Sequence, residues 1–374
     1  MALIKLNTRS IPDAEIGTVN IADDAVTPVK IASELQPFNR IINGAMTIDQ
    51  RNAGATLSLA TTAAPLYAVD RFFAYQDKTG VTGTVGQSTD APAGFKNSFG
   101  VAITTGSTSG AADQSFIAHL IEGLNVADLG FGTANAQTIT LSFWVKSSIT
   151  GTNGFSVGNS VGNRAYIGSY TVNLANTWEQ KTVTIAGDTS GTWLTTNGIG
   201  IRIRFNIGSG SNWFGAAGSW GIFYNGPTGS FSTTATSGAT FYITGLQLEV
   251  GSTASPFEHR QYGQELALCQ RYYEKSYDIN TVAGTNTFSG AIRFRTASSS
   301  VEAPLKFTQT KRATPTVTPY SIIGPSGNIL NVSTGANAAA SVASIGQSGC
   351  FVAKDTGGTD GDQYGFHYTA SAEL

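Results

Sequence analysis

Short runs in which apolar and polar residues alternate are the sequence feature that most restricts how this chain can fold. In TITLSFWVKSS (138–148) every second position from 139 to 145 is apolar, while Trp144 and Lys146 fall on the opposite face. The same alternation recurs in residues 177–187, 198–208 and 239–251. A period of two indicates strands with one buried face. With almost no helical pattern between them, the runs predict an all-β fold in which residues 39–262 form an antiparallel jelly-roll β-sandwich.

The composition agrees with this fold class and excludes several functions. Charged residues make up 12% of the chain, about half the usual ~25%, and 44 glycines supply turns. The net charge is −2 without a Lys/Arg run, so no nucleic-acid partner is expected. No window approaches 18 uninterrupted apolar residues, so no membrane insertion is expected either.

Residues 263–374 begin with a helical pattern. GQELALCQRYYEK (263–275) has apolar residues at helical spacing and an early Glu265, and it can run straight into a strand at RYYEKSY. Strand and turn sequences follow it to the end of the chain. Residues 263–374 are therefore predicted to form a short linking helix, acting as a hinge, and a small C-terminal β-sandwich tip.

Residues 1–38 follow a different rule, because one aliphatic residue recurs at every fifth position. Neither a helix nor a half-buried strand has that period. A single chain buries too little apolar area this way to offset its loss of backbone entropy, whereas three chains sharing an axis bury more. The segment predicts a trimeric stem, and the alternative is a disordered tail. The proposed stem core consists of Leu6, Ile11, Ile16, Ile21, Val26 and Ile31.

The sequence contains no motif that indicates a catalytic or metal-binding site. GNSVG (158–162) matches a nucleophile elbow, but it lies in a Gly/Asn/Ser loop with no helix after it. The three histidines lack partners at metal-ligand spacing, and the acids are scattered. The loop 355–362 carries three aspartates, but it lacks the EF-hand spacing. We expect no enzyme activity, no catalytic residues, no metal and no cofactor.

Glycan binding has a clearer physical basis, since pyranose rings stack on aromatic side chains and polar side chains bond their hydroxyl groups. Trp178 and Trp193 are expected to fill the core, and His367 is expected on a strand surface. Arg202 and Arg204 are expected on the outward face of their strand. The glycan-binding candidates are Trp144, Lys146, Arg202, Arg204, Trp213, Trp220, Tyr364, His367 and Tyr368.

Several blocks of the chain resemble tailed-bacteriophage tail-fibre and virion structural proteins. The most specific are FYITGLQLEVGSTASPFEHRQYGQELALCQRYYEKS (241–276) and GFHYTASAEL (365–374); NRIINGAMTIDQRNAG, YAVDRFFAY and LSFWVKSS also match. The N-terminal IPD-x-x-I and AVT-x-x-KIA patterns are similar to stems that precede such modules. The jelly roll also resembles carbohydrate-binding modules. Their calcium-ligating acid is replaced here by Ala45 and Met46, which puts a calcium site in doubt.

The resemblance implies a virion component, a non-enzymatic bacteriophage tail fibre. Its expected partners are itself, as a homotrimer, the tail, baseplate or capsid proteins through the N-terminal stem, and a host-surface polysaccharide bound during host adsorption. Two alternatives stay open: a purely structural capsid, neck or baseplate decoration protein without receptor binding, and a polysaccharide depolymerase.

Overall fold

The computed structural model of the chain describes residues 39–61, 64–222, 224–296, 301–354 and 361–374. The chain divides into two units, residues 1–38 and 39–374. The predicted stem core, which consists of six aliphatic residues, lies outside the described residues, so the stem and its trimer stay predictions. The residues of this stem core are Leu6, Ile11, Ile16, Ile21, Val26 and Ile31.

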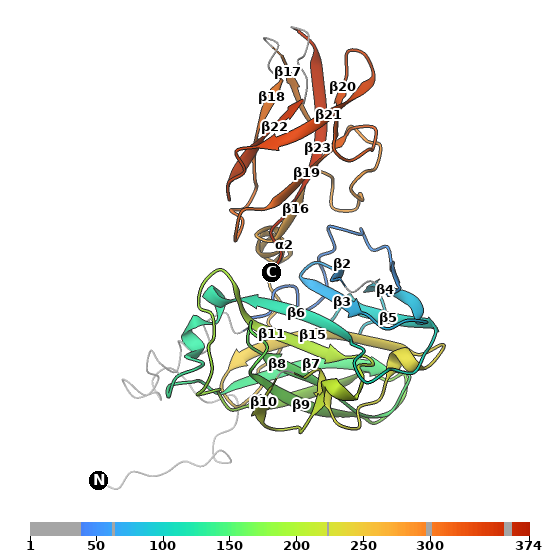
Figure 1. The fold of residues 1–374 in the computed structure, drawn as a ribbon, viewed down its shortest axis with the longest axis vertical. Helices are drawn as coiled ribbons and strands as arrows, with labels where there is room; N and C mark the ends of the chain where they lie inside the picture. Colours follow the sequence, from blue (N-terminus) through green and yellow to red (C-terminus); the bar gives the residue numbers. More distant parts are fainter. Residues whose placement is uncertain (1–38, 62–63, 223, 297–300, 355–360) are drawn as a thin grey trace, which may run out of the picture. The chain divides into compact units, whose positions relative to one another are not determined.

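The alternating runs form two antiparallel sheets (Figure 1). One has six strands in the order β1 (Leu57–Leu59), β4 (Thr82–Ser88), β5 (Ser98–Thr105), β15 (Thr240–Val250), β7 (Ile139–Ser147) and β10 (Glu179–Ile185). The other has seven strands in the order β13 (Trp220–Gly221), β9 (Ala165–Val172), β8 (Gly151–Gly158), β11 (Ile199–Asn206), β6 (Ser115–Glu122), β3 (Phe72–Gln76) and β2 (Leu66–Val69). A short parallel pair, β12 (Phe214–Gly215) and β14 (Gly226–Pro227), lies in the connection between β11 and β15.

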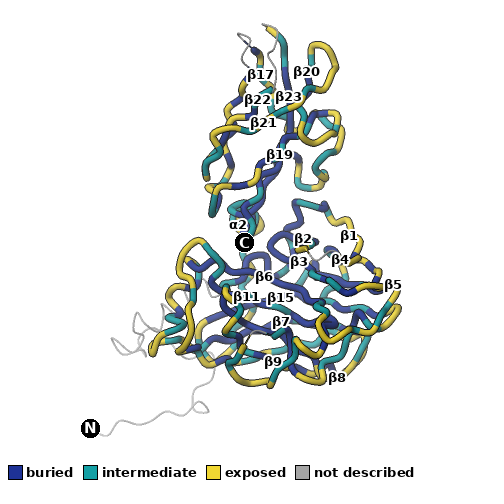
Figure 2. The backbone as a smooth tube through the Cα atoms, in the orientation of Figure 1, coloured by how far each residue is buried: buried dark blue, intermediate teal, exposed yellow. Residues whose placement is uncertain are grey.

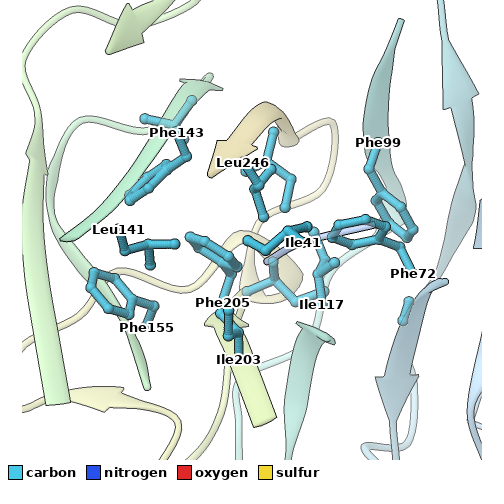
Figure 3. Packing of buried hydrophobic residues seen from close by; sticks show 14 of the residues in the cluster. Ile41, Phe72, Phe99, Ile117, Leu141, Phe143, Phe155, Ile203, Phe205 and Leu246 are labelled. Atoms are coloured by element: carbon cyan, nitrogen blue, oxygen red, sulfur yellow. The ribbon is translucent and has the colours of Figure 1, made fainter. Parts of the chain in front are cut away.

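The inward faces of these two sheets share one hydrophobic core. Phe143 of β7, in the six-stranded sheet, meets Phe155 of β8 and Phe205 of β11 edge to face, with ring centres 5.9 and 4.9 Å apart. Figure 3 shows these rings pointing toward one another. Period-two alternation places the rings in one layer, because successive side chains of a strand point to opposite faces. The predicted β-sandwich is confirmed in this respect.

A third sheet holds the C-terminal strands. It runs β16 (Tyr273–Lys275), β23 (Gln363–Ser371), β20 (Asn328–Asn331), β21 (Ala336–Ala343), β22 (Gly349–Lys354) and β18 (Glu302–Lys306), with β17 (Ile292–Arg295) and β19 (Thr316–Ser321) also paired to β23. Its apolar side chains form a separate core. Figure 2 shows that most of β23 is buried.

The predicted helix is shorter than its sequence pattern. Helix α2 spans Tyr262–Gln270, and β16 follows almost at once, as RYYEKSY suggested. Cys269 of the helix and Tyr272 pack with Ile42 and Ile48, while Glu265 accepts a hydrogen bond from the backbone N–H of Asn43. The helix is therefore packed against the segment that precedes β1, and the proposed hinge and the boundary at residue 262 stay predictions.

The fold class is all-β, as predicted, with α2 the single α-helix within the described ranges. None of the helices in that part of the chain is long and apolar enough to cross a membrane.

Candidate functional site

The outer face of the seven-stranded sheet carries a cavity of about 320 Å³. Strands β3, β6 and β11 supply most of its lining. Its polar and aromatic lining residues are Phe73, Tyr75, Gln114, Phe116, Arg202 and Arg204. The volume lies in the range of about 300–1,000 Å³ that is usual for small-molecule sites.

Strand alternation and register bring these side chains together. In β11, Ile201, Ile203 and Phe205 enter the core, so Arg202 and Arg204 face outward, as the sequence predicted. Strand β6 lies between β11 and β3, with Tyr75 opposite Phe116 and with Ala118 opposite both Phe73 and Arg204. Three strands distant in sequence therefore contribute to one surface.

The aromatic floor of the cavity is a stack. The rings of Tyr75 and Phe116 are nearly parallel, at 11°, with centres 5.0 Å apart. The guanidinium of Arg204 lies 4.1 Å from the centre of the Phe116 ring. Phe116 is thus covered, while Tyr75 is only half-buried. An aromatic ring of this kind can stack against the C–H face of a sugar.

Two arginines form the polar side of the cavity. Arg204 donates through Nη1 to Asn225 Oδ1 at 3.1 Å and to Gln114 Oε1 at 3.4 Å. Arg202 donates through Nη2 to the backbone carbonyl of Ser160 at 2.6 Å. Burial, together with the nearby positive charge of Arg202, lowers the pKa of Arg204 to about 9. Burial likewise lowers the pKa of Arg202.

Trp144 and Lys146 lie on the outer face of the other sheet. Lys146 Nζ pairs with Asp90 Oδ2 at 2.7 Å. Trp178 was expected in the core, and this is wrong: it is half-buried, and its indole N–H donates to Asp90 Oδ1 at 3.0 Å. Trp144 lies close to Gly245, where a φ of 62° accompanies a break in the register of β15. These contacts give Trp144, Lys146 and Trp178 structural roles.

A second cavity of about 400 Å³ lies on that six-stranded sheet, over β4, β5 and β15. Tyr242 is its one aromatic lining residue, and Thr, Ser, Gln, Gly, Ala and Val residues supply the rest. It offers no charged side chain, so it is a weaker candidate than the cavity over β3, β6 and β11.

The remaining tryptophans anchor loops. Trp213 donates its indole N–H to the carbonyl of Ala112 at 2.7 Å, and Trp220 donates to the carbonyl of Ala186 at 2.8 Å. Trp193 and Trp220 pack against each other and against the main core. Core packing is confirmed for Trp193, and the structure does not bring Trp213 or Trp220 to the cavity.

Three predicted glycan contacts are buried in the third sheet. Tyr364 and Tyr368 belong to its core, and the hydroxyl of Tyr368 donates to Glu274 at 2.6 Å. His367 was expected on a surface, and this is wrong. It is fully buried, stacks on Tyr277 with ring centres 3.9 Å apart, and has Ser276 and Thr287 oxygens at its two ring nitrogens. These residues are excluded because Tyr364 and Tyr368 pack into the core of this sheet and His367 is covered by Tyr277.

The arrangement of the described side chains does not support a metal site or a nucleophile elbow. No group of three or more His, Cys, Asp or Glu side chains gathers to hold a metal within the described ranges. Asp355 and Asp360 of the aspartate loop lie outside those ranges. The GNSVG segment is a turn leading directly into β9 rather than into a helix, so it is no nucleophile elbow. The absence of enzyme activity stays a prediction.

The residues predicted from the sequence do not include Tyr75, Phe116, Gln114 and Asn225. The alternation in FFAYQ, the sequence of β3, places Phe73 and Tyr75 on one face, and this signal was available. Their assembly with Arg204 depends on β6 pairing with both β3 and β11, which no local pattern reports.

Comparisons with known proteins find only distant similarity. No protein-family profile matches the chain, and no curated protein matches it. Among solved structures, the enzymatically active domain of bacteriophage CBA120 tailspike protein 4 is 14% identical with a TM-score of 0.28, over 57% of this chain and 22% of the tailspike chain. This chain thus matches about a fifth of that protein's length.

Two carbohydrate-binding modules of Clostridium thermocellum are similar to about the same extent. The family 11 module of the cellulosomal cellulase Lic26A-Cel5E is 13% identical, with a TM-score of 0.27 over 54% of this chain and 99% of the module. The C-terminal family 22 module of Xyn10B is 13% identical, with a TM-score of 0.28 over 54% of this chain and 98% of the module. Because these three TM-scores are all below 0.5, we draw no conclusion about function from these similarities.

Proposed function

We propose that this chain is a non-enzymatic bacteriophage fibre protein that attaches to a host-surface glycan. The glycan binds in the cavity over β3, β6 and β11. The observation that carries this proposal is the half-buried Tyr75, stacked on Phe116 beside Arg202 and Arg204 in a cavity of about 320 Å³.

The chemistry of the cavity suits a sugar. A pyranose presents C–H groups on its faces and hydroxyls around its edge. Tyr75 offers an aromatic face, and Gln114 and Arg204 already share a hydrogen-bonded arrangement at the same cavity. Because Phe116 fixes the Tyr75 ring, little side-chain entropy is lost on binding.

The fibre part of the proposal is supported by the sequence. The period-five segment and the resemblance to fibre stems favour a homotrimer whose first 38 residues dock onto a tail, baseplate or capsid protein of the virion. Binding at each cavity can be weak, because several linked copies raise the overall affinity through avidity.

A glycan array probed with the purified full-length chain tests the glycan part. Binding that is weakened about tenfold in Tyr75→Ala supports the cavity as the site, whereas unchanged binding moves the site elsewhere. If no glycan binds, the structural decoration protein becomes the better hypothesis. Release of reducing ends from a bound polysaccharide would contradict the non-enzymatic role.

A further inference from the structure

Arg202 and Arg204 line the cavity from the same face of β11. Residues two apart on a strand lie about 7 Å from each other. Both side chains are removed from much of the solvent, and the charge of Arg202 opposes that of Arg204, whose pKa is lowered to about 9, first by burial and then by this charge. Two like charges held together in a cavity create a site where an anion is favoured.

The hydrogen bonding of Arg202 is incomplete. Its Nη2 donates to the backbone carbonyl of Ser160 at 2.6 Å, but its Nε is buried and has no hydrogen-bond partner within the described part of the chain. Arg202 forms no ion pair with any described residue. A buried donor without an acceptor is unfavourable. A ligand that supplies an acceptor to the Nε of Arg202 therefore binds with a more favourable free energy.

The cavity supplies no carboxylate of its own from an acidic side chain. None of its lining residues is Asp or Glu. Asp77 is next to the cavity, but its Oδ2 lies 3.5 Å from the hydroxyl of Tyr75, a distance too long for a strong hydrogen bond. Because Arg202 also forms no ion pair with any described residue, its positive charge is available to a ligand.

Resting on the proposed glycan-binding function, we infer that the sugar taken by this cavity is acidic. It carries a carboxylate, as a uronic acid does, which accepts hydrogen bonds from Arg202 while the sugar ring lies on Tyr75. A guanidinium matches the planar carboxylate in a two-bond geometry. A neutral sugar satisfies neither the buried Nε nor the paired positive charges.

The test compares each acidic oligosaccharide with its own carboxyl-reduced form. The full-length chain is titrated by calorimetry with oligogalacturonate, oligoglucuronate and other acidic oligosaccharides found by array, then with the reduced counterparts. These differ from the acids only at the carboxyl group. We expect the acidic member to bind at least about tenfold more tightly and this preference to shrink at high salt.

Variants then assign the preference to a residue. Arg202→Gln keeps a polar, hydrogen-bonding side chain but removes the charge, and it should remove most of the acidic preference. Arg295→Gln is the matched control, because Arg295 is exposed on β17 and away from the cavity. Circular dichroism and melting temperature establish that both variants are folded.

Each outcome decides between the proposals. Equal binding of acid and reduced forms overturns the acidic-sugar inference and leaves glycan binding intact. An acidic preference that survives Arg202→Gln overturns the role of Arg202. If sulfated or phosphorylated sugars bind more tightly than uronic acids, the inference that the acidic group is a carboxylate is wrong. Failure to bind any oligosaccharide instead removes the proposed function itself.

Discussion

Arg271 and Glu122 form a two-bond ion pair although they are 149 residues apart. Arg271 Nε donates to Glu122 Oε2 at 2.9 Å, and Nη2 donates to Oε1 at 2.6 Å. The hydroxyl of Tyr272 adds a third bond at 2.8 Å. Glu122 ends strand β6, whereas Arg271 directly follows α2, so the pair ties the seven-stranded sheet to the start of the C-terminal strands.

Loss of this buried carboxylate should destabilise the fold. Burial by itself would raise the pKa of Glu122, but the hydrogen bonds from Arg271 and Tyr272 outweigh it and lower the pKa below its ordinary value. Glu122→Gln should reduce the free energy of unfolding by about 1–3 kcal/mol, a value discounted because Arg271 is partly exposed. Urea unfolding at pH 7 measures it.

Asp128→Asn is the matched control for that experiment. Asp128 pairs with Arg40 at 2.6 Å, but its side chain is 56% exposed. Exposed pairs contribute about 0–1 kcal/mol. An equal loss in the two variants would contradict the structural role of the Arg271–Glu122 pair.

The packing of Phe143 predicts a large effect of its removal. Its ring contacts those of Phe155 and Phe205 (Figure 3) and that of Tyr170, and it has no exposed surface. Phe143→Ala should lower the free energy of unfolding by about 3–5 kcal/mol, because it removes buried apolar area and leaves a cavity.

Leu174→Ala serves as the control for the core, since Leu174 is 62% exposed. We expect it to change stability by less than about 0.5 kcal/mol. Thermal unfolding followed by circular dichroism compares the two variants, and a Phe143 variant as stable as the Leu174 variant would rule out a packed core at this position.

The raised pKa of Asp70 should make the stability of the fold depend on pH. It is buried and accepts hydrogen bonds from the backbone and side chain of Gln50 at 3.1 and 2.6 Å. Burial raises the pKa of Asp70 from 3.8 to about 6, although Arg51 and Gln50 oppose this. The folded chain then binds more protons than the unfolded chain between these values, so the contribution of Asp70 to stability falls as pH rises from about 4 to about 6.

Asp70→Asn isolates that contribution. The unfolding free energy of the wild type minus that of the variant should fall across this pH window and level off above it. Urea titrations at pH 4, 5, 6 and 7 measure the difference. A difference that stays constant from pH 4 to 7 means that Asp70 has an ordinary pKa in the folded chain.

Removal of the Tyr75 ring should weaken glycan binding in a chain that still folds. Removing one stacked aromatic ring from a sugar should weaken binding about tenfold, on the scale of aromatic contacts. Tyr75→Ala is compared by calorimetry with Tyr262→Ala, whose side chain is exposed on α2. Equal affinities of the two variants would place the glycan elsewhere.

If residues 1–38 form the proposed stem, the homotrimer should depend on them. Light scattering of the full chain should give about three times the chain mass of 38.9 kDa, and a chain starting at residue 39 should be monomeric if the stem holds the trimer. A trimer without the first 38 residues would assign the assembly to residues 39–374. A monomeric full chain would contradict the fibre proposal.

Local pattern determined the faces of individual strands. The alternation in 198–208 predicted that Arg202 and Arg204 point away from the core, and the alternation in 138–148 predicted the inward row that includes Phe143. These predictions were correct because the period of two is a property of the extended backbone itself. The all-β class followed for the same reason.

Tertiary structure decided which strands became neighbours and which faces were covered. Tyr75, Phe116 and Arg204 meet only because β6 pairs with both β3 and β11. His367 lies on an alternating strand, yet it is buried because the Tyr277 ring stacks on it and Ser276 and Thr287 contact its ring nitrogens. Strand pairing joins residues that are far apart in the chain, so no local pattern carries it.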